Sequence, residues 1–260
     1  MSTIHFISFA DTKSEPMLKR IHANAKYTGW FESIETLSEK DFDRSYIRKY
    51  GKYFHMRGFG YWIWKSYIVK RRLSEINDGD VLLYADAGCT LNKLGAKRFR
   101  EYICKLKDND FGMLVFEQQG LIERQWTKGD LLKFTKNRGA TAQFWAGAFM
   151  LRKTPTTIQF VDEYYDLCHN HFNLITDSPS VTPNAIDFIE NRHDQSAFSC
   201  LAKRYSPVVV SADETFTKGD YSVELSDSPI WATRLREYTW YGLKKMSLKK
   251  RFPKLFGKLW

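Results

Sequence analysis

One short segment constrains the fold of this chain more than any other: residues 81–85, Val-Leu-Leu-Tyr-Ala, are followed directly by Asp86 and then by Gly88. An apolar run of this length, with an Asp-Gly-Asp turn before it, is typical of a buried strand in an α/β sheet. Ligands of open α/β sheets bind at the carboxyl ends of the strands, where Asp86 would lie. A desolvated carboxylate needs a cation or several donors, and a divalent cation that carries a diphosphate would suit it. The alternative is a turn in which Asp86 only accepts hydrogen bonds from backbone amides.

Strand-like and helix-like segments alternate along the chain. We expect strands over residues 4–9, 81–85, 112–116, 144–151 and 207–211, and helices over residues 14–25, 41–54, 61–76, 96–106, 128–135, 156–169 and 194–203. This alternation predicts an α/β fold with a Rossmann-like, mainly parallel mixed sheet flanked by helices. The chain has 260 residues, 43% of them hydrophobic, and no linker, repeat or low-complexity block. We therefore expect one domain over residues 1–233 and a separate tail over residues 234–260.

The tail is strongly basic and aromatic. It holds nine Lys and Arg residues against a single acid, Glu237, and so supplies most of the formal net charge of +10. Large apolar side chains are interleaved with the bases, as in amphipathic segments that lie on anionic membranes. Nucleic acid is the rival partner, but contacts with a phosphate backbone do not require large apolar side chains. We expect residues 234–260 to bind an anionic membrane surface and regard a nucleic-acid partner as the less favoured alternative.

The sequence also bears on the compartment. The N-terminal residues lack the basic region and apolar segment of a secretory signal, and no run approaches the roughly 20 apolar residues that span a bilayer. The four cysteines have no CxxC or other metal-ligand spacing. We expect a cytoplasmic protein with reduced thiols that is peripheral on the inner face of the cell membrane.

The first candidate binding segment covers residues 57–65, Arg-Gly-Phe-Gly-Tyr-Trp-Ile-Trp-Lys. Glycines such as Gly60 let the backbone approach a ligand closely, and the helix that begins after them offers free amides to an anion. Arg57 and Lys65 would contact phosphate, and Trp64 could stack on a base. The alternative is a helix whose aromatic side chains pack under the sheet and whose glycines serve only the turn.

The second segment is the strand expected over residues 144–151, which contains Ala146 and Gly147. Such small residues would leave room for a ligand against the backbone. A plain buried strand with one tight contact is the alternative.

The third segment, residues 191–196, opens an otherwise apolar helix with consecutive polar side chains. Asp194 alone would be explained as a helix N-cap. The polar neighbours exceed what capping needs. His193 is a credible ligand for a cation such as Mn²⁺, and Asp194 and Gln195 could hydrogen-bond sugar hydroxyls.

A polar loop over residues 123–130 holds the aromatic Trp126 together with Lys128 and Asp130. It would receive an acceptor sugar or be ordinary solvated surface.

These segments, in this order, resemble the GT-A class of nucleotide-sugar glycosyltransferases. The segment Tyr84-Ala85-Asp86-Ala87-Gly88 is similar to the Asp-x-Asp metal site of that class. Ala146-Gly147 is similar to the Asn-Ala-Gly strand of glycogenin-like and lipopolysaccharide galactosyltransferases, and His193-Asp194-Gln195-Ser196 to the helix start that contacts the donor sugar. The whole set looks like small bacterial transferases of capsule and O-antigen clusters.

The resemblance implies a GT-A fold and the transfer of a sugar from a UDP-sugar, with UDP-galactose as one candidate, to a lipid-linked or membrane-proximal glycan in surface polysaccharide biosynthesis. It implies that Asp194 and Gln195 are catalytic, that Asp86 and His193 hold Mn²⁺ or Mg²⁺, and that the anomeric configuration is retained. The donor site would comprise Phe9, Ala10, Arg57, Gly60, Trp64, Lys65, Asp86, Ala87, Gly88, Ala146 and Gly147, and the acceptor would approach Trp126, Lys128 and Asp130.

Two positions depart from the pattern of the class. Gly88 replaces the second Asp of Asp-x-Asp, so metal binding would rest on Asp86 with His193. Trp145 replaces the Asn before Ala-Gly, so that sugar contact is not carried over. The alternatives to an active transferase are therefore a catalytically inactive scaffold of the same fold and a nucleic-acid-binding protein that uses the basic tail.

Overall fold

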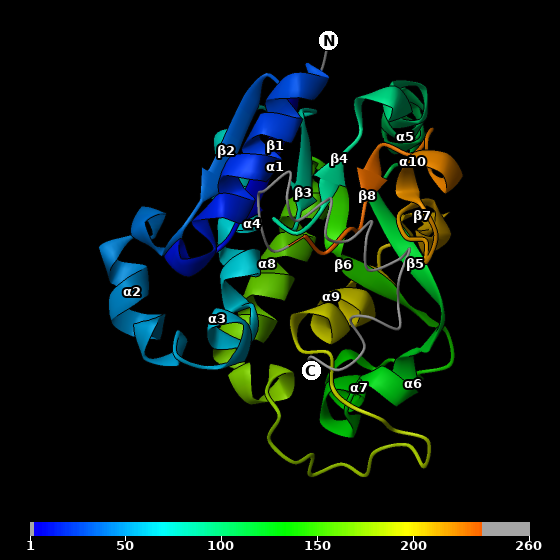
Figure 1. Ribbon diagram of the computed structural model, residues 1–260. Coiled ribbons are helices and arrows are strands. Elements are labelled where there is room, and N and C mark those ends of the chain that lie inside the picture. The colour runs from blue at the N-terminus through cyan, green and yellow to red at the C-terminus, as the bar shows by residue number, and fades with distance from the viewer. Residues whose placement is uncertain (1–2, 236–260) are drawn as a thin grey trace, which may run out of the picture.

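The computed structural model describes residues 3–235, and residues 1–2 and 236–260 lie outside the described part. Six strands form the main sheet in the order β2-β1-β3-β6-β5-β7 (Figure 1). They are β1 (Ile4–Phe9), β2 (Ser33–Leu37), β3 (Val81–Ala85), β5 (Met113–Ile122), β6 (Ala142–Arg152) and β7 (Val208–Ser211). Strand β6 runs antiparallel to both of its neighbours, whereas the other neighbouring pairs are parallel. This is the mainly parallel mixed sheet that the sequence predicts.

Helices cover both faces of the sheet (Figure 1). They are α1 (Glu15–Thr28), α2 (Arg44–Tyr50), α3 (Arg57–Tyr61), α4 (Ile63–Glu75), α5 (Ala96–Asp108), α6 (Glu123–Trp126), α7 (Gly129–Thr135), α8 (Pro155–Asn170), α9 (Asp194–Ala202) and α10 (Tyr221–Glu224). Helices α1 and α5 pack into one hydrophobic core, and helices α4, α8 and α9 pack into the other, on the opposite face. None of the helices within residues 3–235 is long and apolar enough to cross a membrane.

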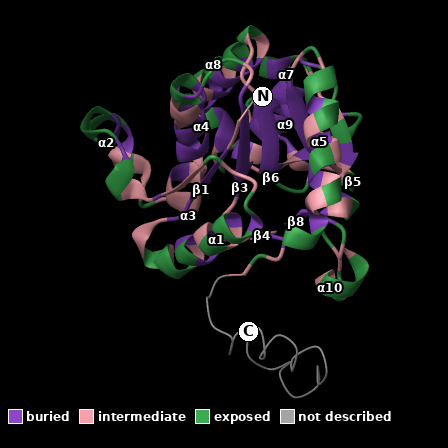
Figure 2. Cartoon of the chain, turned by 90° about the horizontal axis from the view of Figure 1, so that it is seen from above, coloured by how far each residue is buried: buried purple, intermediate pink, exposed green. Residues whose placement is uncertain are grey.

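Strand β3 shows why the apolar run in the sequence was informative. Leu82 and Tyr84 join the core under α4, α8 and α9, whereas Val81, Leu83 and Ala85 join the core under α1 and α5. Successive side chains of a strand point to opposite faces, so a strand that is covered on both faces must be apolar throughout. The central strands are buried in this way (Figure 2).

Four regions differ from the expectations. Strand β2 lies over Ser33–Leu37, where no strand was expected. The helix expected over residues 41–54 is reduced to α2, flanked by the short 3₁₀ turns η2 (Glu39–Asp41) and η3 (Gly51–Tyr53). Strand β5 continues to Ile122 instead of ending at residue 116, with irregular pairing to β6. A separate ribbon pairs β4 (Thr90–Leu91) with β8 (Ile230–Trp231). Strands of two residues are too short to show periodicity, so this ribbon could not be predicted from the sequence.

Candidate functional site

The carboxyl end of β3 carries Asp86. Its amide donates to the carbonyl of Gly147 on β6 at 2.8 Å, and its carboxylate accepts a hydrogen bond from the Tyr84 hydroxyl at 2.5 Å. Burial, and then the charge of Asp86, raise the pKa of Tyr84 well above its usual range, so the phenol stays protonated and donates. The Asp86 side chain is 40% exposed and is open to a ligand.

Helix α4 supplies the cation that faces this carboxylate. The Nζ atom of buried Lys65 lies 3.4 Å from Asp86 Oδ1 and 2.7 Å from Asp194 Oδ2. It also donates to the carbonyl of Ala146 at 3.0 Å. Burial disfavours the charged ammonium, but the two carboxylates outweigh burial and the pKa of Lys65 is raised. Asp86, Lys65 and Asp194, called the charged trio below, thus join the end of β3 to the start of α9.

Asp194 is the first residue of α9 and is buried. Burial raises its pKa, Lys65 acts against this, and the nearby charge of Asp86 adds to the rise. The residue before it, His193, has φ 55° and ψ −123°. Such a conformation costs about 1–3 kcal/mol and is most often found at functional sites.

Gln195 points toward strands β5 and β6. Its Nε2 donates to Gln118 Oε1 and to Gln143 Oε1, at 2.9 Å in each case. Gln143 donates in turn to the fully buried carboxylate of Glu123 at 3.0 Å. Both hydrogens of the Gln195 amide are therefore used, and its Oε1 is left to accept a hydrogen bond from a ligand hydroxyl.

The segment before α4 has an unusual backbone. Residues 58–62 all have positive φ, between 53° and 89°. The left-handed backbone conformation costs each L-residue roughly 1–2 kcal/mol of conformational free energy. Three of these five residues are aromatic rather than glycine. Trp64 stabilises the turn by donating from Nε1 to the carbonyl of Gly58 at 3.1 Å. The predicted turn is thus a left-handed one, and it sets the start of the helix that carries Lys65.

The aromatic side chains predicted to contact the donor are used in the core. The rings of Phe9 and Trp64 stack with their centroids 4.0 Å apart, and Phe9 also stacks on Phe42. Both rings are buried, with exposed fractions of 4% and 5%, and are therefore closed to a base. Ala10 is buried in the core on the opposite face of the sheet. This is the packing alternative that the sequence left open. Next along the chain, Asp11 Oδ1 is buried and has no hydrogen-bond partner among residues 3–235.

The other residues that were predicted to line the donor site lie in different surroundings. Gly60 is buried in the left-handed turn, whereas Arg57 is exposed. The Ala87 carbonyl accepts a hydrogen bond from Arg20 at 2.5 Å. The Gly88 carbonyl accepts from later in the chain, as described below.

The room expected beside Gly147 is filled by protein. A Cβ atom at Gly147 would lie 2.3 Å from the indole of Trp145, because side chains two residues apart share one face of a strand. The tryptophan that replaces the asparagine of the GT-A class therefore covers this part of the backbone. Ala146 contributes its carbonyl to Lys65 rather than an open space.

Two of the three residues predicted to meet an acceptor hold a loop instead. Asp130 accepts from the amides of Val181 and Thr182 at 2.8 and 2.7 Å, and these amides outweigh the effect of burial and lower its pKa to about 2. The Nζ atom of Lys128 is surrounded by the carbonyls of Asn173, Thr176 and Ser178. The expected acceptor contact of Lys128 and Asp130 is thus replaced by anchoring of residues 176–182. Trp126 remains partly exposed.

The two predicted metal ligands face different partners. His193 Nδ1 donates to the carbonyl of Ile175 at 2.8 Å, and its Nε2 lies 3.7 Å from Asp177 Oδ1. Asp86 already faces the ammonium of Lys65. Within residues 3–235, no group of three or more His, Cys, Asp or Glu side chains is placed to hold a metal ion. The donor set therefore fits a divalent cation poorly, and the Mn²⁺ or Mg²⁺ expected from the resemblance stays a prediction.

Two arginines that the sequence did not assign to the site lie beside it. The Gly88 carbonyl accepts hydrogen bonds from Thr233 Oγ1 and the Leu235 amide, both at 3.0 Å, so Arg234 lies against the turn after β3. The guanidinium of Arg192 lies over the ring of Trp126 at 4.3 Å. The polar cluster at residues 191–196 was a signal for Arg192, whereas Arg234 was grouped with the basic tail, whose residues 236–260 lie outside the described part.

Comparisons with known proteins support the fold. No family model and no curated protein matches this sequence. A glycosyltransferase involved in the glycosylation of the major capsid of PBCV-1 is 10% identical, with a TM-score of 0.54 over 95% of this chain and 99% of its own. The galactosyltransferase LgtC, in complex with donor and acceptor sugar analogs, is 12% identical with a TM-score of 0.47 over 95% of each chain. Mouse xyloside xylosyltransferase 1 is 10% identical with a TM-score of 0.43, over 89% of this chain and 97% of its own. On the first of these matches, together with the mixed sheet and its flanking helices, the chain has the fold of GT-A-type glycosyltransferases.

Proposed function

We propose that this chain is a retaining hexosyltransferase that moves a sugar from a UDP-sugar to a membrane-associated glycan in surface polysaccharide biosynthesis. The charged trio is the observation that carries the proposal. It places an open carboxylate, Asp86, and a buried ammonium, Lys65, at the carboxyl end of β3. That edge is where open α/β sheets bind nucleotides, and the fold is shared with a solved glycosyltransferase.

Residues around the trio suit the parts of such a donor. Asp11 Oδ1, unpartnered after β1, accepts an N–H of the base or a ribose hydroxyl. The diphosphate lies at the turn that contains Gly88. The sugar lies at the start of α9, where Gln195 Oε1 accepts one of its hydroxyls.

The chemistry follows from charge. Transfer breaks the bond between the anomeric carbon and the diphosphate, so negative charge grows on the leaving group and positive charge on the sugar. The Lys65 ammonium is buried, and a fixed cation that is shielded from water stabilises the negative charge on the leaving group strongly. The Asp194 carboxylate stabilises the positive charge on the sugar and, with Gln195, orients the sugar ring.

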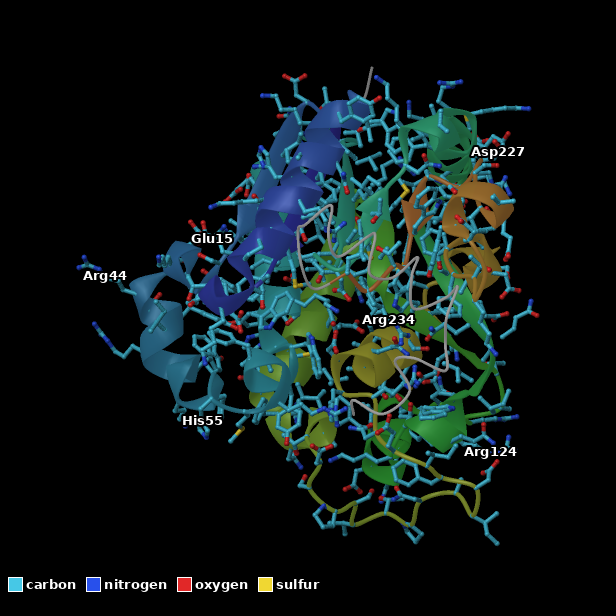
Figure 3. All side chains as sticks on the ribbon, viewed as in Figure 1. Glu15, Arg44, His55, Arg124, Asp227 and Arg234 are labelled. Carbon is cyan, nitrogen blue, oxygen red and sulfur yellow. The ribbon has the colours of Figure 1, made fainter. Side chains whose placement is uncertain are left out.

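A panel of nucleotide sugars tests the proposal. We expect one nucleotide sugar to be hydrolysed slowly and to raise the melting temperature of the protein. NMR of the transfer product should show that the configuration at the anomeric carbon is retained. Asp194→Asn should lower the rate about 100-fold or more, as loss of one group that stabilises a transition state does. Asp227→Asn is the matched control, because this exposed carboxylate lies at the far edge of the molecule (Figure 3).

The other outcomes identify the alternatives. Binding of UDP without hydrolysis or transfer of any sugar would indicate an inactive scaffold. Binding of DNA or RNA in a salt-sensitive gel shift, without binding of any nucleotide sugar, would indicate a nucleic-acid-binding protein.

The membrane part of the proposal needs its own variant. Because the Leu235 amide binds Gly88, the tail should be truncated after Leu235 rather than before Arg234. We expect the truncated chain to stay in the supernatant with anionic liposomes and to transfer sugar to a soluble acceptor at the full-length rate. Equal pelleting of the two chains would exclude the tail as the membrane anchor.

A further inference from the structure

A nucleoside diphosphate brings several negative charges to the end of β3, and the charged trio does not neutralise them. Two carboxylates and one ammonium leave the trio with one net negative charge, which repels an incoming diphosphate. Gly88 stands where the GT-A class has a second metal-binding carboxylate, and His193 is bound to the carbonyl of Ile175. Binding of a diphosphate therefore needs a further positive charge. A metal ion could supply this charge, but no group of three or more ligands for such an ion is assembled in residues 3–235.

Arg234 is one source of this charge. The chain at residues 233–235 is fixed to the carbonyl of Gly88 by two hydrogen bonds, and a Cβ atom at Gly88 would lie 3.4 Å from the Cα atom of Arg234. The Arg234 guanidinium carbon lies 5.9 Å from the centre of the Phe216 ring. The guanidinium forms no ion pair with any carboxylate of residues 3–235. Figure 3 shows Arg234 near the centre of the molecule in this view.

Arg192 is the second source. Its amide donates to the Trp126 carbonyl at 3.1 Å and to Ser196 Oγ at 3.0 Å, so its backbone is fixed two residues before Asp194. Burial lowers the pKa of the Arg192 guanidinium, Glu190 acts against this, and the charge of Arg234 lowers it further. Like Arg234, it has no ion pair with any carboxylate of residues 3–235. Arg234 is exposed and Arg192 is partly exposed, so both can reach an anion, and an anion bound by both would relieve their repulsion.

We propose that Arg192 and Arg234 bind the diphosphate of the donor from two sides, so that this chain binds its donor without a divalent metal ion. The proposal rests on the proposed function and goes beyond it. Guanidinium groups suit the role because they remain charged and bind phosphate oxygens in a bidentate manner. With both arginines, the group of five side chains carries one net positive charge, and the attraction for a diphosphate no longer depends on a metal ion.

Calorimetric titration of UDP in EDTA, and again in excess Mn²⁺, tests this inference on the full chain. We expect the wild-type affinity in EDTA to be within about threefold of that in Mn²⁺. Arg192→Gln and Arg234→Gln should each weaken UDP binding in EDTA about tenfold or more, as the loss of a charge-assisted hydrogen bond does. Arg44→Gln, which removes the same charge from an exposed position on α2 far from the site (Figure 3), should bind UDP like the wild type. Inorganic pyrophosphate should displace UDP from the wild type but only weakly from the two site variants.

The outcomes separate this inference from the proposed function. UDP binding that appears only with Mn²⁺, or that survives both arginine substitutions, would overturn the inference and leave the transferase intact. Absence of binding by UDP, GDP, CDP, ADP and dTDP in both EDTA and Mn²⁺ would overturn the proposed function and the inference with it. Unchanged melting temperatures of the variants exclude misfolding as the cause of lost binding.

Gly88→Asp provides a converse test. A carboxylate at this position would face Arg234 and restore the two-aspartate pattern of the GT-A class. We expect this variant to bind UDP more weakly than the wild type in EDTA and to recover part of the affinity in Mn²⁺. Equal affinity of the variant and the wild type in EDTA would count against the arginine site.

Discussion

Lys65 Nζ lies 2.7 Å from Asp194 Oδ2, and both side chains are buried, with exposed fractions of 3% and 6%. Removing two charges from water costs several kcal/mol per ion, and an ion pair in the interior seldom recovers more than this cost. The pair is therefore a poor source of stability. It does hold the starts of α4 and α9 together in front of Asp86, at the place where we propose that the donor binds.

Substitution of the pair separates its structural and functional roles. Lys65→Met leaves the buried carboxylate of Asp194 without its partner and should lower the free energy of unfolding by about 3–5 kcal/mol. The double variant Lys65→Met/Asp194→Leu removes both charges and should recover most of this loss while donor hydrolysis stays absent. Urea unfolding and hydrolysis assays on the single and double variants measure both effects. If Lys65→Met were as stable as the wild type, the ion pair would not exist in solution.

The left-handed turn before α4 predicts a second contrast. Gly60 has φ 89°, and Gly79, in the turn before β3, has φ 84°. Replacing either by alanine should cost about 1–2 kcal/mol, because L-residues are strained in this conformation. Only Gly60→Ala should also lower UDP affinity and sugar transfer, because Gly60 lies in the turn that sets the start of the helix carrying Lys65. A Cβ atom at Gly79 would meet nothing within 4 Å, so Gly79→Ala should leave the site unchanged. Equal activity of the two variants would show that the turn does not control the site.

The elements of the fold could be predicted from sequence because burial leaves a simple pattern. Strand β3 is apolar throughout since it is covered on both faces, and α9 is recognised by the polar residues that precede its apolar run. Periodicity gives no direction, however, and the antiparallel orientation of β6 depends on the path of the chain through α6 and α7. Aromatic side chains were equally ambiguous: Phe9 and Trp64 pack on each other, a contact that neither residue's neighbours in sequence indicate.

The sequence singled out the three residues of the charged trio but not the contacts between them. Asp86, Lys65 and Asp194 were each singled out, yet their meeting depends on the register of β3 and on where α4 begins. Lys128 illustrates the opposite failure, because a polar residue in a loop has the same sequence signal whether it binds a ligand or backbone carbonyls. Arg234 was not predicted as a site residue for a different reason, because it is the first of many basic residues in the C-terminal segment.

The close approach at Gly147 leads to a third prediction. Gly147→Ala places a Cβ atom 2.3 Å from the Trp145 indole, so the ring must move, at a cost of about 1–3 kcal/mol. The movement should also disturb the hydrogen bond from the Asp86 amide to the Gly147 carbonyl and lower UDP affinity. Gly88→Ala is the control, because its Cβ atom would make an ordinary contact of 3.4 Å with Arg234 and should change stability by less than about 0.5 kcal/mol. Similar urea midpoints for the two variants would contradict the tight packing of Trp145.

The buried histidine that joins α2 to α8 predicts how stability depends on pH. His169 Nδ1 donates to the Tyr165 carbonyl at 2.8 Å, and its Nε2 accepts from the Tyr46 hydroxyl at 3.0 Å. Burial lowers the pKa of His169 to about 4, whereas a histidine in the unfolded chain titrates near 6.5. As the pH falls, the unfolded chain therefore binds a proton before the folded chain does. The stability provided by the neutral ring is complete above pH ~6.5 and is lost progressively as the pH falls toward about 4.

Urea unfolding at pH 7 and pH 5 measures this loss. The wild type should lose roughly 2 kcal/mol more than His169→Gln between the two pH values, because glutamine keeps a donor and an acceptor but has no proton to gain. His55→Gln is the matched control, since His55 is exposed (Figure 3), and its pH dependence should follow that of the wild type. If His169→Gln lost as much stability as the wild type between pH 7 and pH 5, His169 would be protonated in the folded chain, and its ring could not accept the hydrogen bond from Tyr46.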